Sequence, residues 1–126
     1  MKTYLEFLET QLHEGFNHIV AAQRAKIEAE SRTPGTSGNY LSLAKHQNAL
    51  RLHHEGLASF HDNNNNMNEG NVHRERALDY ARGASLNLAN YHHTKAKELV
   101  NDNLESSVNH QKKGDDEMER YRKLKA

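Results

Sequence analysis

The proline-free stretch 72–104 constrains the fold of this chain more than any other feature, and it contains a single glycine, Gly83. One set of its positions recurs every three or four residues, which predicts one face of an α-helix and excludes the strict alternation of a strand. These positions are Ala77, Ala81, Ala84, Leu88, Tyr91, Lys95 and Leu99. Because most of them hold alanine, a neighbouring helix can approach closely. Because an isolated helix is unstable in water, we expect such neighbours.

Composition narrows the class of protein. The chain has 126 residues, which suits one domain, and 17 basic against 17 acidic residues. Its mean hydropathy is −1.02, but the long periodic segments and balanced charge argue against disorder. The absence of cysteine excludes disulfides, thiolate metal sites and a cysteine nucleophile. Carboxylates at Glu6, Glu9 and Glu14 interrupt the first apolar pattern, so we expect a cytoplasmic protein without a membrane partner.

Two further helices are predicted, at 3–31 and 40–62. The first has apolar positions at Leu5, Leu8, Leu12, Phe16, Ile19 and Ile27, and the second at Tyr40, Leu43, Leu50, Leu57 and Phe60. Proline and two glycines break the chain between them, within 32–39, where Ser37 or Asn39 can cap the second helix. An asparagine-rich loop, 63–71, separates the second helix from the third.

The third helix is predicted to span 70–111, and Gly114 to stop it before a short C-terminal helix or tail, 114–126. The domain would then be a helical unit, 1–113, followed by that tail. We therefore expect an all-α fold. Its architecture would be an up–down three-helix bundle or a long helical hairpin with a short C-terminal helix.

If the chain reverses near residues 36 and 67, the three helices lie side by side and certain side chains lie level with one another. We call this set of pairings the level map. His18 would then lie level with His54, His54 with Glu75 and Asp79, and His61 with His73. The third helix would extend past the other two beyond about Lys95. Its last aliphatic residues would have no partner within the chain, which predicts a homo-oligomer interface: Leu99, Val100, Leu104 and Val108.

Histidine is unusually abundant, with ten in the chain. Histidines and carboxylates from facing helices can hold a divalent metal. The level map predicts one such group at Glu14, His18, His54 and Asp79, and a second layer at His13, His61 and His73. The alternative is that the histidines are ordinary polar residues of the helix seams. A histidine buried in a seam, at His46, His53 or His54, would have a lowered pKa.

No nucleotide-binding loop or catalytic motif is present, so we expect no enzyme and no obligate cofactor. The tail carries a basic group that could contact nucleic acid: Arg120, Arg122, Lys123 and Lys125. The sequence favours a helical protein–protein interaction module that assembles with itself and with another protein, as an adaptor or inhibitor. A small helical protein of this composition would suit the role of a phage accessory protein. The alternative is a histidine-rich bundle that binds a divalent metal or nucleic acid.

Overall fold

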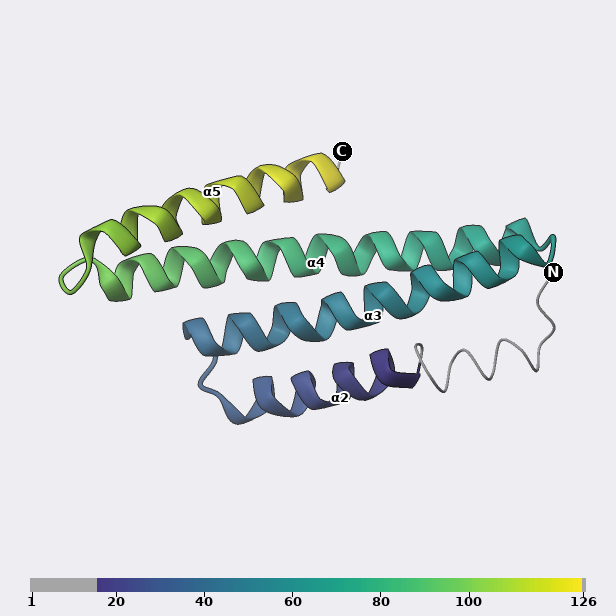
Figure 1. The fold of residues 1–126 in the computed structure, drawn as a ribbon, viewed down its shortest axis with the longest axis horizontal. Coiled ribbons are helices and arrows are strands. Elements are labelled where there is room, and N and C mark those ends of the chain that lie inside the picture. Colours follow the sequence, from purple (N-terminus) through teal and green to yellow (C-terminus); the bar gives the residue numbers. More distant parts are fainter. Residues whose placement is uncertain (1–15, 126) are drawn as a thin grey trace.

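The chain is all-α over the part that the computed structural model describes, residues 16–125. Four helices and no strands occur there (Figure 1). They are α2 (Phe16–Ser31), α3 (Ser37–Asn63), α4 (Met67–Leu99) and α5 (Leu104–Lys125). The expected all-α class is confirmed. The first half of the predicted helix 3–31 lies outside the described residues.

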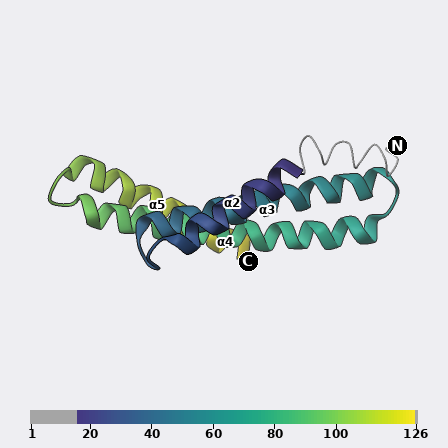
Figure 2. The same cartoon turned by 90° about the horizontal axis from the view of Figure 1, so that it is seen from below.

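The helices form an open array in which each one packs extensively only on its neighbours in the chain. The central pair, α3 and α4, is a long antiparallel hairpin. In Figure 1, α2 lies on the outer side of α3, and α5 lies on the outer side of α4. Figure 2 shows the α4–α5 and α3–α4 hairpins reaching in opposite directions from the middle of the molecule. The closed three-helix packing allowed by the sequence is therefore replaced by a row of helix pairs.

Small side chains make up the whole described core. Every buried hydrophobic residue is alanine: Ala22, Ala25, Ala29, Ala44, Ala49, Ala58, Ala77, Ala84, Ala89 and Ala96. Helix axes can approach closely over such residues, so side chains on one helix reach the backbone of the next. Asn39 donates to the Ala29 carbonyl at 3.0 Å, and His46 Nδ1 lies 2.8 Å from the Ala22 carbonyl. Because a carbonyl only accepts, the His46 ring carries a proton on Nδ1.

The asparagine run forms the α3–α4 turn, but that turn is shorter than the predicted loop 63–71. Asn64 follows the last residue of α3, and the Asn66 side chain accepts a hydrogen bond from the Glu69 amide at the start of α4. Between them, Asn65 has a φ of 60°, in the left-handed region that asparagine tolerates better than most residues. With Asn66 as the cap, α4 begins at Met67 instead of near residue 70.

The prediction of one helix over 70–111 is wrong, because α4 ends at Leu99 and α5 starts at Leu104. The intervening residues contain Asn101, Asp102 and Asn103, whose side chains compete with the backbone for hydrogen bonds. Asn103 Oδ1 accepts from the Ser106 amide at 3.1 Å, which caps the new helix. The chain therefore turns back, and α5 covers the outer side of α4.

The predicted stop at Gly114 is also absent, since α5 runs through it. Gly114 is buried, and a Cβ there would come 2.3 Å from His93 Cδ2. The glycine thus serves the close approach of α5 to α4 and does not end a helix.

Candidate functional site

Histidine rings from α3 and α4 meet near the turn of the α3–α4 hairpin. His54 Nδ1 lies 3.0 Å from His73 Nδ1, so one ring donates a hydrogen bond to the other. His61 stacks on His73 with ring centroids 5.4 Å apart and an interplanar angle of 1°. His54 also stacks on Tyr80, with ring centroids 5.6 Å apart. We call His54, His61 and His73 the histidine layer. The expected pairing of His61 with His73 is confirmed.

A carboxylate joins this layer from the first turns of α4. His61, Glu69 and His73 each offer a ligand atom, and the three atoms lie within 4.8 Å of one another. Glu69 and His73 are four residues apart, so they share one face of α4, and His61 faces them from α3. Over the described residues, this is the one group of three or more histidine, aspartate or glutamate side chains arranged in this way.

Burial disfavours the charged form of three histidines in this region, His53, His54 and His73. Desolvation, helped by the nearby His53 and His73, lowers the pKa of His54 to about 4. Desolvation also lowers the pKa of His73, with His61 and Arg76 acting in the same direction and Glu69 opposing them. The pKa of His53 is lowered by desolvation and then by His18. The expected direction for His53 and His54 is therefore confirmed.

A second histidine pair joins α4 to α5. His92 Nδ1 lies 2.9 Å from His110 Nδ1, and His93 Nε2 lies 3.0 Å from a carboxylate oxygen of Asp115. Desolvation lowers the pKa of His92, assisted by His110 and Lys113. It lowers the pKa of His110 as well, assisted by Lys113 and Lys95. This pair was not predicted from the sequence, because it depends on α5 folding back onto α4.

Among the described residues, the predicted metal group is not found as one cluster of ligand atoms. Glu14 lies outside the described residues. His54 is bonded to His73, whereas Asp79 is ion-paired with Arg82 at 2.9 Å and is exposed. His18 lies close enough to His53 to affect its pKa. The level map placed His54 at the right height on α4, but the facing side chains are His73 and Tyr80 in place of Glu75 and Asp79.

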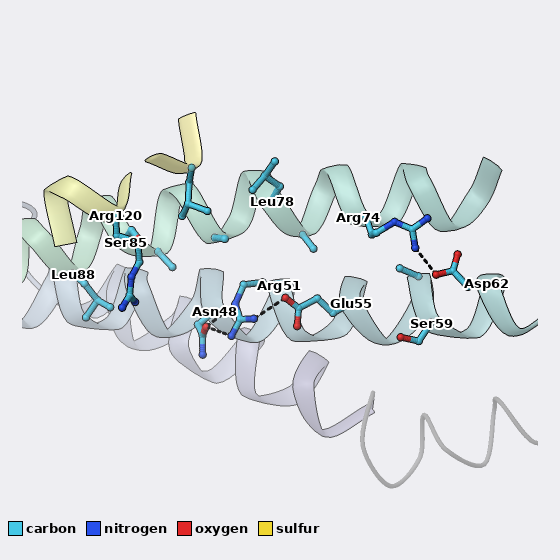
Figure 3. A pocket seen from close by; sticks show the side chains of 15 residues that line it. Asn48, Arg51, Glu55, Ser59, Asp62, Arg74, Leu78, Ser85, Leu88 and Arg120 are labelled. Carbon is cyan, nitrogen blue, oxygen red and sulfur yellow. Dashed lines mark hydrogen bonds and ion pairs between the residues drawn. The ribbon is translucent and has the colours of Figure 1, made fainter. Parts of the chain in front are cut away.

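An open groove of about 910 Å³ lies between α3, α4 and the C-terminal end of α5 (Figure 3). Alanine and leucine line much of it: Ala58, Ala77, Leu78, Ala81, Ala84, Leu88 and Leu124. Its charged lining consists of three arginines, Arg51, Arg74 and Arg120, against the carboxylates of Glu55 and Asp62. Arg51 pairs with Glu55 at 2.7 Å, and Arg74 pairs with Asp62. We call this feature the alanine groove.

The residues predicted as an oligomer interface lie at the α4–α5 turn and not on an extended overhang. Leu99 is half-buried, while Val100, Leu104 and Val108 are 48%, 64% and 60% exposed. We call these three exposed residues the apolar tip. No lysine or arginine occurs in the segment 99–111 around them, which carries the carboxylates of Asp102 and Glu105.

The basic residues proposed to contact nucleic acid lie on the last turns of α5. Arg120 reaches Glu117 at 3.4 Å, and Arg122 and Lys123 are exposed. The side chain of Lys125 lies outside the part of the chain that the structure describes. The acidic residues of α5 share the helix with these cations, so no uniformly basic face forms.

Comparison with protein-family models, curated proteins and solved structures finds no match to this chain. None of the described helices combines the length and apolarity needed to cross a lipid bilayer.

Proposed function

We propose that this protein is a helical protein–protein interaction module that assembles with a second copy of itself. The observation that carries the proposal is the apolar tip: three aliphatic residues, each about half exposed or more, lie close together in sequence around the α4–α5 turn of a very polar chain. Exposed aliphatic side chains scattered singly are ordinary on protein surfaces, whereas a group at one place marks a contact surface.

The alanine groove of a second copy is the occupant we assign to this tip. Its small apolar lining leaves room for aliphatic side chains to enter between α3 and α4. Charge argues against the simplest alternative. The tip segment 99–111 carries two carboxylates and no lysine or arginine, so two tips in contact would repel each other. The groove arginines are balanced by Glu55, Asp62 and Glu117, so the groove offers no such repulsion.

The expected energy suggests a concentration-dependent assembly. Complete burial of a fully exposed aliphatic side chain contributes about 1.5–3 kcal/mol, and the tip residues are about half exposed, so the tip supplies roughly 2.5–5 kcal/mol. Association costs about 4–15 kcal/mol in lost freedom of motion. The tip alone therefore gives weak binding, and burial of the groove leucines has to add to it. Reciprocal insertion of both tips would close a two-fold dimer, whereas one-way insertion would build a chain.

Light scattering coupled to size-exclusion chromatography tests the proposal over a range of protein concentrations. We expect wild type to exceed the monomer mass as concentration rises. The double variant Leu104→Glu, Val108→Glu should stay monomeric with unchanged helical circular dichroism. The groove variant Leu78→Glu should do the same.

The matched control is Ile27→Glu, because Ile27 is an exposed aliphatic residue on α2 that lies in neither the tip nor the groove. It should associate as wild type does. Mixing the tip variant with the groove variant should restore part of the association, because one intact tip and one intact groove are then available. A wild type that stays monomeric at high micromolar concentration contradicts the proposal. Failure of the mixture to associate rules out the tip-to-groove contact.

A further inference from the structure

Three side chains with metal-binding chemistry converge where α3 and α4 meet at their turn. His61 comes from the end of α3, and Glu69 and His73 come from the first turns of α4. Their ligand atoms lie within 4.8 Å of one another. Ligands that share one metal at about 2.0–2.2 Å are roughly 3–3.5 Å apart. Side-chain rotations that move the ligand atoms by about an ångström or two would therefore bring the three atoms to one ion.

We propose that His61, Glu69 and His73 form a binding site for a divalent transition-metal ion of the zinc class, which clamps α3 to the start of α4. Two imidazole nitrogens and one carboxylate suit zinc, nickel, cobalt or copper, and provide too few oxygen ligands for calcium or magnesium. Water would complete the coordination, since the Glu69 side of the site is exposed.

A second layer of contacts already holds one ligand in place. His73 Nδ1 is hydrogen-bonded to His54 Nδ1 at 3.0 Å. With His73 as the donor, its Nε2 keeps the lone pair that a metal ion needs. His54 is itself stacked against Tyr80. Metal-binding histidines commonly use their other ring nitrogen in this way, which fixes the tautomer and the orientation of the ring.

The local charges act on a bound cation in opposite directions. Glu69 supplies the negative charge that the cation needs. Arg76 opposes it, because this cation lies close enough to influence His73. We therefore expect a site of moderate affinity that selects by ligand type.

The clamp would join two helices across the hairpin turn, because His61 lies before the turn and both other ligands lie after it. An ion that binds the folded hairpin and not the unfolded chain stabilises the fold in proportion to its concentration over the dissociation constant. This site is separate from the apolar tip, so its loss and the loss of self-association are distinguishable.

Isothermal titration of the full chain with Zn²⁺, after treatment with EDTA and its removal, tests the site. We expect one ion per chain, a rise in the melting temperature, and reversal of that rise by EDTA. Mg²⁺ should produce neither effect. His61→Ala and His73→Ala should abolish the saturable binding. His54→Leu keeps all three ligands but removes the hydrogen bond to His73, and it should weaken Zn²⁺ binding by roughly tenfold to a hundredfold.

Two further variants serve as controls for misfolding and for zinc binding at other histidines. Glu69→Gln changes an exposed side chain without disturbing the fold, and it should weaken Zn²⁺ binding while the helical circular dichroism stays unchanged. His92→Ala removes a histidine of the α4–α5 pair and should bind Zn²⁺ as wild type does. Absence of any Zn²⁺ binding overturns the proposal. So does binding that persists undiminished in His61→Ala and His73→Ala, since the ion would then use other histidines.

Discussion

His93 packs directly over Gly114, at a place where α5 has no room for a side chain. A Cβ on Gly114 would lie 2.3 Å from His93 Cδ2, and the same imidazole contacts Asp115 at 3.0 Å. Gly114, which the sequence pattern predicted to end a helix, is thus a contact point between two helices. The consequence is measurable, because the chain offers a second glycine in the middle of a helix with open space around it.

Gly56→Ala and Gly114→Ala should therefore change stability in opposite directions. Nothing lies within 4 Å of a Cβ at Gly56, so alanine there gains helix propensity alone and should stabilise the fold by about 0.5–1 kcal/mol. At Gly114 the same gain is opposed by displacement of His93, and overpacking costs about 1–3 kcal/mol. We expect Gly114→Ala to be destabilising in urea unfolding. Equal stabilisation by both substitutions would contradict the packing of α5 on α4.

The turn between α4 and α5 makes a similar prediction with a clear sign. Asn103 Oδ1 caps α5 by accepting from the Ser106 amide, so Asn103→Ala should cost about 1 kcal/mol. In a continuous helix the same substitution would stabilise, because alanine is the better helix former. Urea midpoints decide between the two, with Asn109→Ala as the control: Asn109 is exposed in the helical body of α5, where alanine should be neutral or stabilising.

The α3–α4 turn depends on the backbone of one residue. Asn65 has a φ of 60°, which costs most residues other than glycine about 1–2 kcal/mol. Asn65→Gly should leave stability unchanged or raise it slightly, and Asn65→Val should lower it by at least about 1 kcal/mol. Asn68→Val, on the exposed first turn of α4, is the matched control and should have a much smaller effect. Similar unfolding midpoints for the two valine variants would show that the turn is not strained.

Sequence periodicity predicted the α3–α4 hairpin and which of its residues lie level, but not which faces of the two helices meet. A reversal near residue 67 predicts His54 level with Asp79, which is the chain neighbour of the Tyr80 ring that His54 stacks on. The side chains that contact it cannot be chosen by height alone, because neighbouring residues on a helix point about 100° apart. The alanine core adds to this difficulty, since the alanines of α3 and α4 do not mark one face uniquely and α5 contains no alanine.

The α4–α5 turn was missed for a different reason. Val108 continues the apolar spacing of the third helix, and that signal outweighed the Asn-Asp-Asn sequence at 101–103. Asparagine and aspartate are poor helix formers and good caps, so the turn is encoded locally. The histidine pair of α4 and α5 follows from that turn. It could not be predicted while the two segments were read as one helix.

The α4–α5 histidine pair also predicts how stability depends on pH. His92 and His110 both have a pKa lowered by desolvation, and His93, Lys95 and Lys113 add positive charge around them. Among the described residues, the carboxylate that contacts these histidines is that of Asp115, which lies 3.0 Å from His93 Nε2. The unfolded chain, with histidine pKa values near 6.5, then binds more protons than the folded chain below that pH.

The pair's contribution to stability is therefore complete above about pH 6.5 and declines as the pH falls toward the lowered folded values. His110→Gln keeps a polar side chain beside His92 but removes one titrating ring and its repulsion. With EDTA present to exclude metal, wild type should lose more stability than His110→Gln between pH 7.5 and 5.5, measured as urea midpoints. The control is Gln111→His, which adds an exposed histidine on α5 and should leave the loss close to that of wild type. An identical pH dependence for wild type and His110→Gln would mean that the pair is not desolvated, and hence that α5 does not cover this part of α4.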